Sequence, residues 1–254
     1  MGRLDDNVVI VTGGANGIGR WYCTALALEG ARVVVCDIDG PGAADFAGWL
    51  NDRAGAERAY PLCVDVTSPE RTADMAATVM ARFGAIDVLV NNAGSYPHVA
   101  FEDIDHDAWR RVITLNLDSV FLCCRAVLPV MVKQGRGAIV NVATNLVWSG
   151  LANMAHYIAA KSGVIGLTKA LAREYGEHGV RVNALAPGAV VPDLPDRRLS
   201  PAGREAVEEI LQYQSVKRHQ HPRDLVGTML FLCSAESEFM SGQVLTVDGG
   251  LTMH

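Results

Sequence analysis

The sequence lacks the features that mark membrane-bound and nucleic-acid-binding proteins. No stretch approaches the run of roughly 18 apolar residues that a membrane span requires. Lys and Arg number 22 against 28 Asp and Glu, so the net charge is −6, and there is no basic stripe. An apolar strand pattern follows the first residues almost at once, which leaves no room for a signal peptide. We therefore expect no membrane or nucleic-acid partner and a cytoplasmic location.

Metal-binding and disulfide patterns are also missing. The six cysteines have no paired spacing of the kind that metal ligands show. Most of them fall within apolar strand or helix patterns, so we interpret them as reduced core residues. His219 and His221 are close in sequence, but no cysteine or acidic cluster accompanies them. We predict no metal site.

The sequence does contain a regular alternation of strand-like and helix-like segments. No linker or repeat divides the 254 residues, so we expect one domain over 1–254. Apolar, β-branched runs separated by helical patterns predict an α/β fold, a Rossmann-type doubly wound parallel sheet. The expected strands cover 8–11, 32–36, 59–64, 86–90, 138–142, 180–185 and 244–247, and the helical patterns cover about 70–83, 103–133, 155–177 and 222–235.

The first expected strand leads into a glycine-rich turn, from Gly13 to Gly19, and then into a helical pattern. Glycines let the backbone approach a pyrophosphate closely, and the N-terminus of the helix supplies free N–H groups. The spacing, Gly-x3-Gly-x-Gly, departs from the commoner Gly-x-Gly-x-x-Gly, and glycine turns also occur without any ligand. The residues of this turn expected at a cofactor are Gly13, Asn16, Gly17, Ile18 and Gly19.

The second expected strand ends at Asp37, 24 residues after Gly13. An acidic residue at about this distance binds the hydroxyls of the adenosine ribose. Its carboxylate would repel a 2′-phosphate, and neither Asn16 nor Ile38 supplies a compensating positive charge. Asp37 is alternatively a turn residue at the end of a strand. After a glycine-rich turn we favour the cofactor interpretation, with NAD rather than NADP.

Tyr157 and Lys161 stand four residues apart, which places both side chains on one face of a helix. A nearby positive charge favours the phenolate, so Lys161 is expected to lower the phenol pKa from its ordinary value of about 10. The pair alone is also an ordinary surface pattern. Polar residues at the ends of several strands favour a site, because parallel strands end at one edge of a sheet: Asp65, Asn91-Asn92-Ala93-Gly94, Thr144 and Pro187-Gly188.

With these motifs in place, the chain resembles the compact short-chain dehydrogenase/reductases, from Gly13 to Asp248-Gly249-Gly250. The resemblance implies that residues up to about 145 bind the cofactor and that about 146–254 carry the catalytic helix and a substrate lid. It implies catalytic roles for Asn116, Thr144, Tyr157 and Lys161. The other residues that it places at the cofactor are Ile38, Asp65, Val66, Asn92, Ala93, Gly94, Pro187, Gly188 and Val190, besides Tyr157 and Lys161.

Two positions depart from the family pattern. Thr144, 13 residues before Tyr157, stands where the family usually has serine. Threonine keeps the hydroxyl donor, but its methyl group crowds the pocket. Pro192 replaces a threonine that often contacts the nicotinamide carboxamide, and proline has no backbone N–H to donate. We expect the catalytic role at 144 to survive and cofactor anchoring near 192 to be looser.

The resulting hypothesis is an NAD-dependent oxidoreductase that interconverts a secondary alcohol and a ketone. Tyr157 exchanges the hydroxyl proton and Thr144 donates to the substrate oxygen. By resemblance, Lys161 also binds the nicotinamide ribose and Asn116 holds a proton-relaying water. A 3-oxoacyl-type reductase that uses NADPH is an alternative, against which Asp37 argues. A non-catalytic NAD-binding module is an alternative of a different class.

The substrate is less determined than the chemistry. The resemblance makes 189–216, with Pro192, Asp193, Leu194 and Pro195, the substrate lid, and it implies a homo-oligomer, commonly a tetramer. Apolar and aromatic residues suggest an uncharged, moderately hydrophobic cyclic or aryl substrate. A polyol or sugar, bound through Asn145, Asn153, His156 and Asp193, remains the competing interpretation. The expected substrate contacts are Thr144, Tyr157, Tyr96, Leu146 and Trp148, with Pro97, His98, Met154 and Leu194 nearby.

Overall fold

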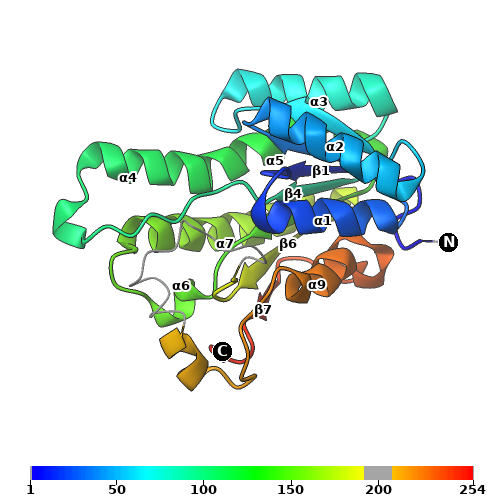
Figure 1. Ribbon diagram of the computed structural model, residues 1–254. Coiled ribbons are helices and arrows are strands. Elements are labelled where there is room, and N and C mark those ends of the chain that lie inside the picture. The colour runs from blue at the N-terminus through cyan, green and yellow to red at the C-terminus, as the bar shows by residue number, and fades with distance from the viewer. Residues whose placement is uncertain (1, 192–207, 254) are drawn as a thin grey trace.

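The structure is a computed structural model that describes residues 2–191 and 208–253 (Figure 1). The described residues form a seven-stranded sheet in the order β3-β2-β1-β4-β5-β6-β7, and every neighbouring pair is parallel. This confirms the predicted doubly wound parallel sheet in a single domain. The strands are β1 (Val8–Thr12), β2 (Arg32–Asp37), β3 (Ala59–Cys63), β4 (Val88–Asn91), β5 (Gly137–Val142), β6 (Val180–Pro187) and β7 (Val244–Val247).

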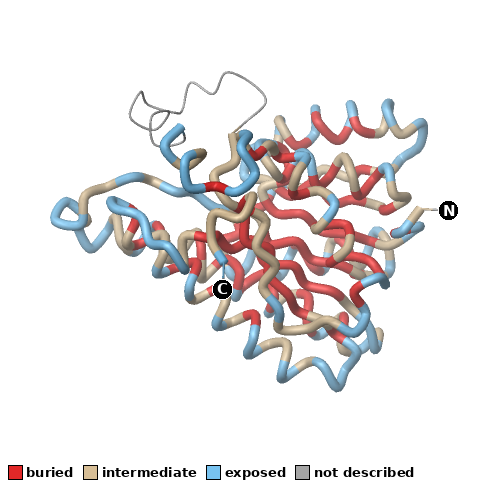
Figure 2. The backbone as a smooth tube through the Cα atoms, turned by 90° about the horizontal axis from the view of Figure 1, so that it is seen from below, coloured by how far each residue is buried: buried red, intermediate tan, exposed pale blue. Residues whose placement is uncertain are grey.

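Helices cover both faces of the sheet (Figure 1). Residues of alternating parity along β1 point to opposite faces, so Val9 and Val11 belong to one core cluster and Val8 and Ile10 to the other. The first cluster is closed by α1 (Gly17–Leu28), α2 (Gly40–Ala54) and α9 (Arg223–Cys233), and the second by α3 (Pro69–Phe83), α5 (Ser119–Gln134) and α7 (Ala155–Tyr175). The buried backbone of the central strands is red in Figure 2.

Local sequence explains where several helices begin and end. Helix α3 starts with Ser68 as a cap, whose side chain accepts the N–H of Arg71, and Pro69 occupies its first turn. It ends at Gly84, whose φ of 76° suits glycine better than any other residue. Helix α2 was not predicted from the sequence, since Gly40, Pro41 and Gly42 at its start interrupt the helical pattern.

The long helical pattern predicted at about 103–133 is divided in the structure. It comprises a 3₁₀ turn (Phe101–Asp103), α4 (His106–Ile113), a π-helical segment (Thr114–Asp118) and α5. Taken together, His106–Gln134 is long and apolar enough to cross a membrane, but half of its most apolar window is buried within the protein. That burial is typical of a core helix, and the expectation that the chain has no membrane partner stays a prediction.

The direction of the winding reverses between β1 and β4. The chain runs outward from β1 to β3 in one direction and from β4 to β7 in the other. In such sheets a crevice forms at the carboxyl ends of the strands where the order reverses, and ligands bind there. A Cβ atom at Gly13 would lie 3.0 Å from Cα of Ala93, so the turns after β1 and β4 meet at this point. The fold therefore places the glycine-rich turn at the expected ligand crevice.

Candidate active site

The glycine-rich turn leaves the N-terminus of α1 without a side-chain cap. Asn16 is the cap residue, and its side chain makes no capping hydrogen bond. By contrast, Asp39, Ser68 and Asp105 cap α2, α3 and α4 through their side chains. Asn16 thus leaves the N–H groups of the first turn of α1 without a side-chain cap in the described part of the chain, which fits a phosphate group as their ligand.

Close packing explains the glycines in this turn. A Cβ at Gly19 would lie 2.0 Å from the carbonyl oxygen of Gly13, so no larger residue fits there. Gly13 and Gly17 have φ values of 62° and 53°, in the left-handed region that favours glycine. At Gly17 a Cβ would meet nothing within 4 Å. The requirement at Gly17 is therefore conformational, and the one at Gly19 is steric.

Asp37 lies beside this turn, as the sequence predicts. Its Oδ2 accepts the backbone N–H of Ala15 at 3.1 Å, and its Oδ1 accepts the N–H of Asp39 at 3.1 Å. The carboxylate is therefore fixed at the end of β2, next to the half-exposed turn. Ile38, the neighbouring cofactor candidate, is 71% exposed and free to contact a ligand.

The end of β3 is followed by two more predicted cofactor residues, Asp65 and Val66. Asp65 accepts both the backbone N–H and the hydroxyl of Thr67, at 2.9 and 2.6 Å. These hydrogen bonds lower the pKa of Asp65 below its ordinary value. Val66 is buried in the core cluster that includes Val64. Asp65 thus stays ionised beside the crevice, while most of Val66 packs inward.

A threonine that sequence reasoning missed joins β1 to the turn after β4. Thr12 Oγ1 accepts the N–H groups of Asn92 and Ala93, at 3.0 and 3.1 Å. In the other direction, Asn92 Nδ2 donates to the carbonyl oxygens of Thr12 and Gly13, at 3.0 and 3.1 Å. The signal was a hydroxyl residue at the end of the first strand, directly before Gly13. Asn92 and Ala93 therefore fix the start of the glycine-rich turn through these hydrogen bonds.

Asn116 lies in the π-helical segment between α4 and α5. Its Nδ2 donates to the carbonyl oxygens of Ser95 and Val112, at 2.9 and 3.0 Å. Its Oδ1 is buried and has no hydrogen-bond partner among the described residues. A single widened turn of this kind is frequent at functional sites. The bulge turns the Asn116 amide toward Gly94, whose Cβ would lie 2.7 Å from Oδ1.

Lys161 is 3% exposed and reaches the same point from α7. Its Nζ donates to the carbonyl oxygen of Val142 at 2.7 Å, and it lies 3.7 Å from the Cβ position of Gly94. Both groups lie near the position that a Cβ of Gly94 would occupy. Because Gly94 has no side chain, space is left between the Lys161 ammonium and the Asn116 amide oxygen. Burial lowers the pKa of Lys161 to about 8.

Tyr157 and Thr144 meet at the carboxyl end of β5. Burial raises the pKa of Tyr157 to about 12, a hydrogen bond with Thr144 opposes that rise, and Tyr96 adds to it. The lowered pKa expected from Lys161 is therefore wrong for the protein alone. The ammonium lies 5.9 Å from the centre of the phenol ring, and desolvation of the phenolate dominates.

Two of the predicted substrate-side residues contact this pair, and a third, Met154, lies three residues before Tyr157. The ring of Tyr96 meets that of Tyr157 edge to face, with centroids 6.3 Å apart. Leu146 donates its N–H to Thr144 Oγ1 at 3.3 Å, and Met154 is buried at the start of α7. The hydroxyl of Thr144 thus faces Tyr157 on one side and is held by the backbone of Leu146 on the other.

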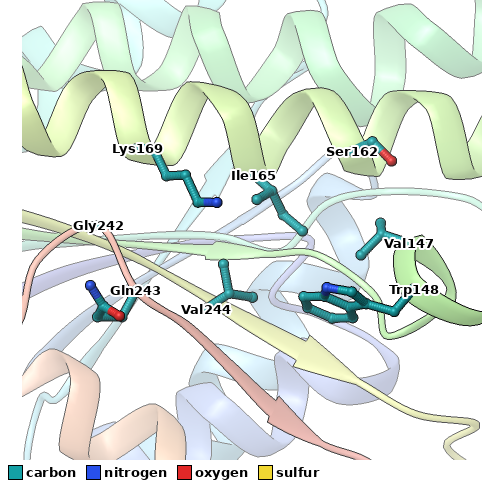
Figure 3. Close-up of a pocket in the computed structure, with 8 residues that line it drawn as sticks. All are labelled: Val147, Trp148, Ser162, Ile165, Lys169, Gly242, Gln243 and Val244. Carbon is teal, nitrogen blue, oxygen red and sulfur yellow. The ribbon is translucent and has the colours of Figure 1, made fainter. Parts of the chain in front are cut away.

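Trp148 is a further predicted substrate contact. It lines a hollow of about 380 Å³ between α6 (Leu146–Ser149), α7 and β7, together with Ile165, Lys169 and Gln243 (Figure 3). None of those three neighbours belongs to the predicted site. The structure therefore shows Trp148 at this hollow, and its contact with substrate stays a prediction.

The end of β6 supplies the remaining cofactor candidates. Pro187 accepts the N–H of Asn145 at 3.0 Å, and Gly188 donates to Val247 at 3.0 Å. Val190 forms an isolated parallel bridge with Gln220. Pro187 and Gly188 thus lie next to the residue that follows Thr144. Pro192, Asp193, Leu194 and Pro195, assigned to the lid, lie outside the described residues.

The arrangement fits a nicotinamide dinucleotide. One edge of the sheet, at the reversal of strand order, carries an uncapped helix N-terminus, a fixed carboxylate 22 residues after Ala15, the partly exposed Tyr157 and the buried Lys161. The side chains of the site can exchange a proton through the Tyr157 phenol, but they cannot transfer a hydride. A bound cofactor would supply the hydride transfer. The fold and this edge define a dinucleotide-dependent oxidoreductase. Among the described residues, no group of three His, Cys, Asp or Glu is placed to hold a metal ion.

Comparisons with known proteins agree with this class. The family model described as enoyl-(acyl carrier protein) reductase matches residues 13–252. Cis-4-hydroxycyclohexanecarboxylate dehydrogenase of Sinomonas cyclohexanicum is 40% identical over 97% of both chains. D-threitol dehydrogenase of Mycolicibacterium smegmatis is 35% identical over 99% of this chain and 95% of its own. A gluconate 5-dehydrogenase of Burkholderia cenocepacia, solved with NADP and tartrate, superposes with a TM-score of 0.91 at 33% identity, over 98% and 96% of the two chains.

The chain belongs to the short-chain dehydrogenase/reductase family. Its relatives are named for the oxidation of hydroxyl groups or the reduction of carbonyl groups, so the chain is an oxidoreductase of that kind. Members of the family bind nicotinamide cofactors.

Proposed function

We propose that the protein uses NAD to interconvert an uncharged secondary alcohol and its ketone. The observation that carries this proposal is the meeting of Tyr157 and Thr144 at the crevice, with Lys161 buried behind them. The nicotinamide, when bound, supplies or accepts the hydride. The protein contributes the position of the substrate oxygen and the path of the proton.

Thr144 and Tyr157 act on the substrate oxygen. The Thr144 hydroxyl donates to that oxygen and stabilises the charge that develops on it. Tyr157 gives its proton to the oxygen during reduction and takes it during oxidation. Because burial raises the pKa of Tyr157 to about 12, the phenol is protonated and ready as an acid in the free protein. Oxidation requires positive charge nearby to favour the phenolate.

Lys161 and Asn116 serve the proton path. The Lys161 ammonium supplies positive charge near Tyr157 and, by resemblance to the family, binds the nicotinamide ribose. Burial lowers its pKa to about 8, so near neutral pH it stays mostly protonated but releases a proton more easily than an ordinary lysine. The Oδ1 of Asn116, which has no partner within residues 2–191 and 208–253, is suited to accept a hydrogen bond from a water that connects Lys161 with solvent.

Asp37 supports NAD over NADP. Its two oxygens already accept the N–H groups of Ala15 and Asp39, so the carboxylate cannot turn away from a 2′-phosphate without breaking them. The negative charges of the Asp37 carboxylate and of a 2′-phosphate would repel each other, which opposes the binding of NADP. The gluconate 5-dehydrogenase structure contains NADP, so the fold itself does not select NAD, and the preference depends on residues such as Asp37.

The substrate proposal depends on the surroundings of Thr144. The ring of Tyr96 lies edge to face against Tyr157, and the partly buried Leu146 follows Thr144 by two residues, which supports an aromatic and aliphatic lining near the reacting oxygen. A cyclic or aryl alcohol fits that surface, and the hydroxycyclohexanecarboxylate dehydrogenase is a relative with a cyclic substrate. The threitol dehydrogenase favours a second candidate, a polyol. The expected partner is a small-molecule substrate. By resemblance to the family we also expect a homo-oligomer, commonly a tetramer, and a cytoplasmic location.

Initial rates on a substrate panel test the proposal. NADH absorbance is followed with cyclohexanol, 1-phenylethanol, threitol, a hexose and a 3-hydroxyacyl thioester, with NAD and with NADP. We expect the first two to react fastest with NAD. Tyr157→Phe is the control, because it removes only the phenol oxygen. Fast turnover of threitol favours the polyol candidate, and preference for the thioester with NADP favours a 3-oxoacyl reductase. NAD binding without turnover of any compound identifies a non-catalytic module.

A further inference from the structure

Asp248, directly after β7, is a charged residue that is only 4% exposed. A buried carboxylate is stable only when several donors surround it. Its Oδ1 accepts the N–H groups of Gly250 and Leu251, at 3.0 and 3.2 Å. Its Oδ2 accepts the N–H and the hydroxyl of Thr252, at 2.9 and 2.7 Å. Asp248 therefore orders the turn that follows it.

One further donor to Asp248 comes from another part of the chain. Asn145 Nδ2 donates to Asp248 Oδ2 at 3.1 Å, across 103 residues of sequence. Burial raises the pKa of Asp248, but the hydrogen bonds from Thr252 and Asn145 outweigh that effect, and the pKa lies below its ordinary value. The carboxylate is thus charged and bonded to Asn145 at neutral pH.

Asn145 is the residue next to Thr144 and is 1% exposed. Its backbone N–H donates to Pro187 at 3.0 Å, and its side chain bonds to Asp248. The chain directly after Thr144 is thereby held at two points, one on β6 and one after β7. The position of the Thr144 hydroxyl follows from the position of that backbone.

Asp248 also contacts the parts of the chain predicted to surround the nicotinamide and the substrate. A Cβ at Gly188 would lie 2.8 Å from Cβ of Asp248, so the loop after β6 rests on this residue. The turn that Asp248 orders binds the segment at the end of the predicted lid. Ser215 Oγ donates to Gly250 at 3.1 Å, and Val216 donates to Gly249 at 2.9 Å.

We propose that Asn145 and Asp248 are positioning residues that hold the Thr144 hydroxyl in register with Gly188 and with residues 215–216. The inference rests on the proposed role of Thr144 in alcohol oxidation. Neither residue acts on the substrate. Their effect on the reaction is exerted through the geometry at Thr144, where small displacements of a reacting group cost a large part of the rate.

The first test replaces the Asn145 amide and compares the result with a matched control. Asn145→Ala removes the donor to Asp248. Asn183→Ala removes an equally buried amide, 1% exposed, whose Nδ2 donates to Met240 at 2.8 Å and whose Oδ1 accepts the N–H of Gln243 at 3.0 Å. Asn183 lies in the middle of β6 and joins this strand to the chain before β7, whereas Asp248 follows the other end of β7. Both variants lose a buried hydrogen-bonding group, but only one lies beside the site.

The measurements are kcat, the dissociation constant of NAD, the melting temperature and the deuterium isotope effect with an alcohol labelled at the carbinol carbon. For Asn145→Ala we expect kcat to fall by about tenfold or more, with a raised isotope effect and NAD binding within a few fold. Asn183→Ala should lower the melting temperature similarly and leave the isotope effect unchanged. Equal effects of the two variants on kcat and on the isotope effect would overturn the proposal.

An exchange of the two side chains adds a test by rescue. Asn145→Asp alone brings two carboxylates together, and Asp248→Asn alone brings two amides together. The double variant restores one donor and one acceptor between the two residues in reverse order, while the turn loses one acceptor oxygen of residue 248, as it does in Asp248→Asn. We expect its kcat to exceed that of either single variant by about threefold or more, because residues in contact are energetically coupled. Additive losses in the double variant would contradict direct coupling.

A readout without turnover separates this inference from the proposed function. Amide hydrogen exchange at Gly250, Leu251 and Thr252 reports the turn that Asp248 orders. We expect faster exchange there in Asn145→Ala than in the parent or in Asn183→Ala. A parent that binds NAD but oxidises no alcohol removes the proposed function and leaves this measurement valid. Unchanged exchange in Asn145→Ala overturns the positioning pair whatever the activity.

Discussion

Thr12 and Asn92 are joined by hydrogen bonds in both directions. Thr12 Oγ1 accepts the N–H of Asn92 at 3.0 Å, and Asn92 Nδ2 donates to the carbonyl oxygen of Thr12 at 3.0 Å. These bonds connect β1 and β4 where the winding of the sheet reverses. The glycine-rich turn begins at the next residue, so its position depends on this pair.

Thr12→Val tests that dependence. Valine keeps the shape but leaves the N–H groups of Asn92 and Ala93 without their acceptor, in a place where Thr12 is 2% exposed. We expect the free energy of unfolding to fall by about 1–3 kcal/mol and NAD affinity to weaken several fold. Urea titration and fluorescence titration with NAD measure the two quantities. Thr24→Val is the control, because the Thr24 hydroxyl makes an exposed hydrogen bond within α1. Parental stability in Thr12→Val would show that the bonds are dispensable.

The sheet could be predicted because each strand carries its own apolar, β-branched pattern. Strands predicted at 32–36, 138–142 and 244–247 match β2, β5 and β7 to within one residue. Helix α2 escaped prediction, because two glycines and a proline stand in its first turn. The π-helical break at Asn116 also escaped, since a bulge of one residue leaves the apolar pattern almost unchanged.

The site could be predicted where spacing along the chain carries the information. Tyr157 and Lys161 share a helix face, and Asp37 ends the strand after the glycine turn. The link between Asn145 and Asp248 spans 103 residues, and no local pattern signals it. The raised pKa of Tyr157 was missed for a related reason. Burial is a property of the fold, and the sequence spacing showed only the favourable charge.

Asp37→Ser is expected to reduce the preference for NAD. The parent should favour NAD over NADP by about tenfold or more in kcat/KM, which corresponds to about 1.4 kcal/mol. Serine removes the negative charge and keeps a hydrogen-bonding oxygen for the ribose. Asp39→Ser is the matched control, because serine also caps helices and Asp39 caps α2 through Gly42. Equal efficiency of the parent with both cofactors would remove the argument from charge.

The buried Lys161 makes stability depend on pH. Burial lowers its pKa from 10.5 to about 8, so the unfolded chain binds more protons than the folded one between these values. The free energy of unfolding contributed by this group therefore rises with pH from about 8 toward 10, on the order of 2 kcal/mol. Above pH 10 the raised pKa of Tyr157 acts in the opposite direction.

Lys161→Met isolates this effect. Urea titrations of the parent and the variant between pH 7 and 10 give the two dependences on pH. We expect the parent to gain stability relative to Lys161→Met across that range. Lys169→Met is the control, since Lys169 is exposed on the same helix. Parallel curves for the parent and Lys161→Met would mean that Lys161 titrates as an ordinary lysine.

The family usually has serine where this chain has Thr144. We expect threonine to be tolerated at this position because it keeps the hydroxyl. Thr144 is 6% exposed, and its Oγ1 accepts the N–H of Leu146 while it faces Tyr157. Thr144→Ser keeps the hydroxyl and removes the methyl group, so we expect kcat within a few fold of the parent. Thr144→Val keeps the shape and removes the hydroxyl, and we expect kcat to fall by roughly 10² to 10³. NADH absorbance gives kcat, and fluorescence titration should show NAD binding unchanged in both variants. Because valine and threonine fill the same space, a crowded pocket affects the parent and Thr144→Val alike. Parental turnover by Thr144→Val would therefore rule out a role for the hydroxyl at the substrate oxygen.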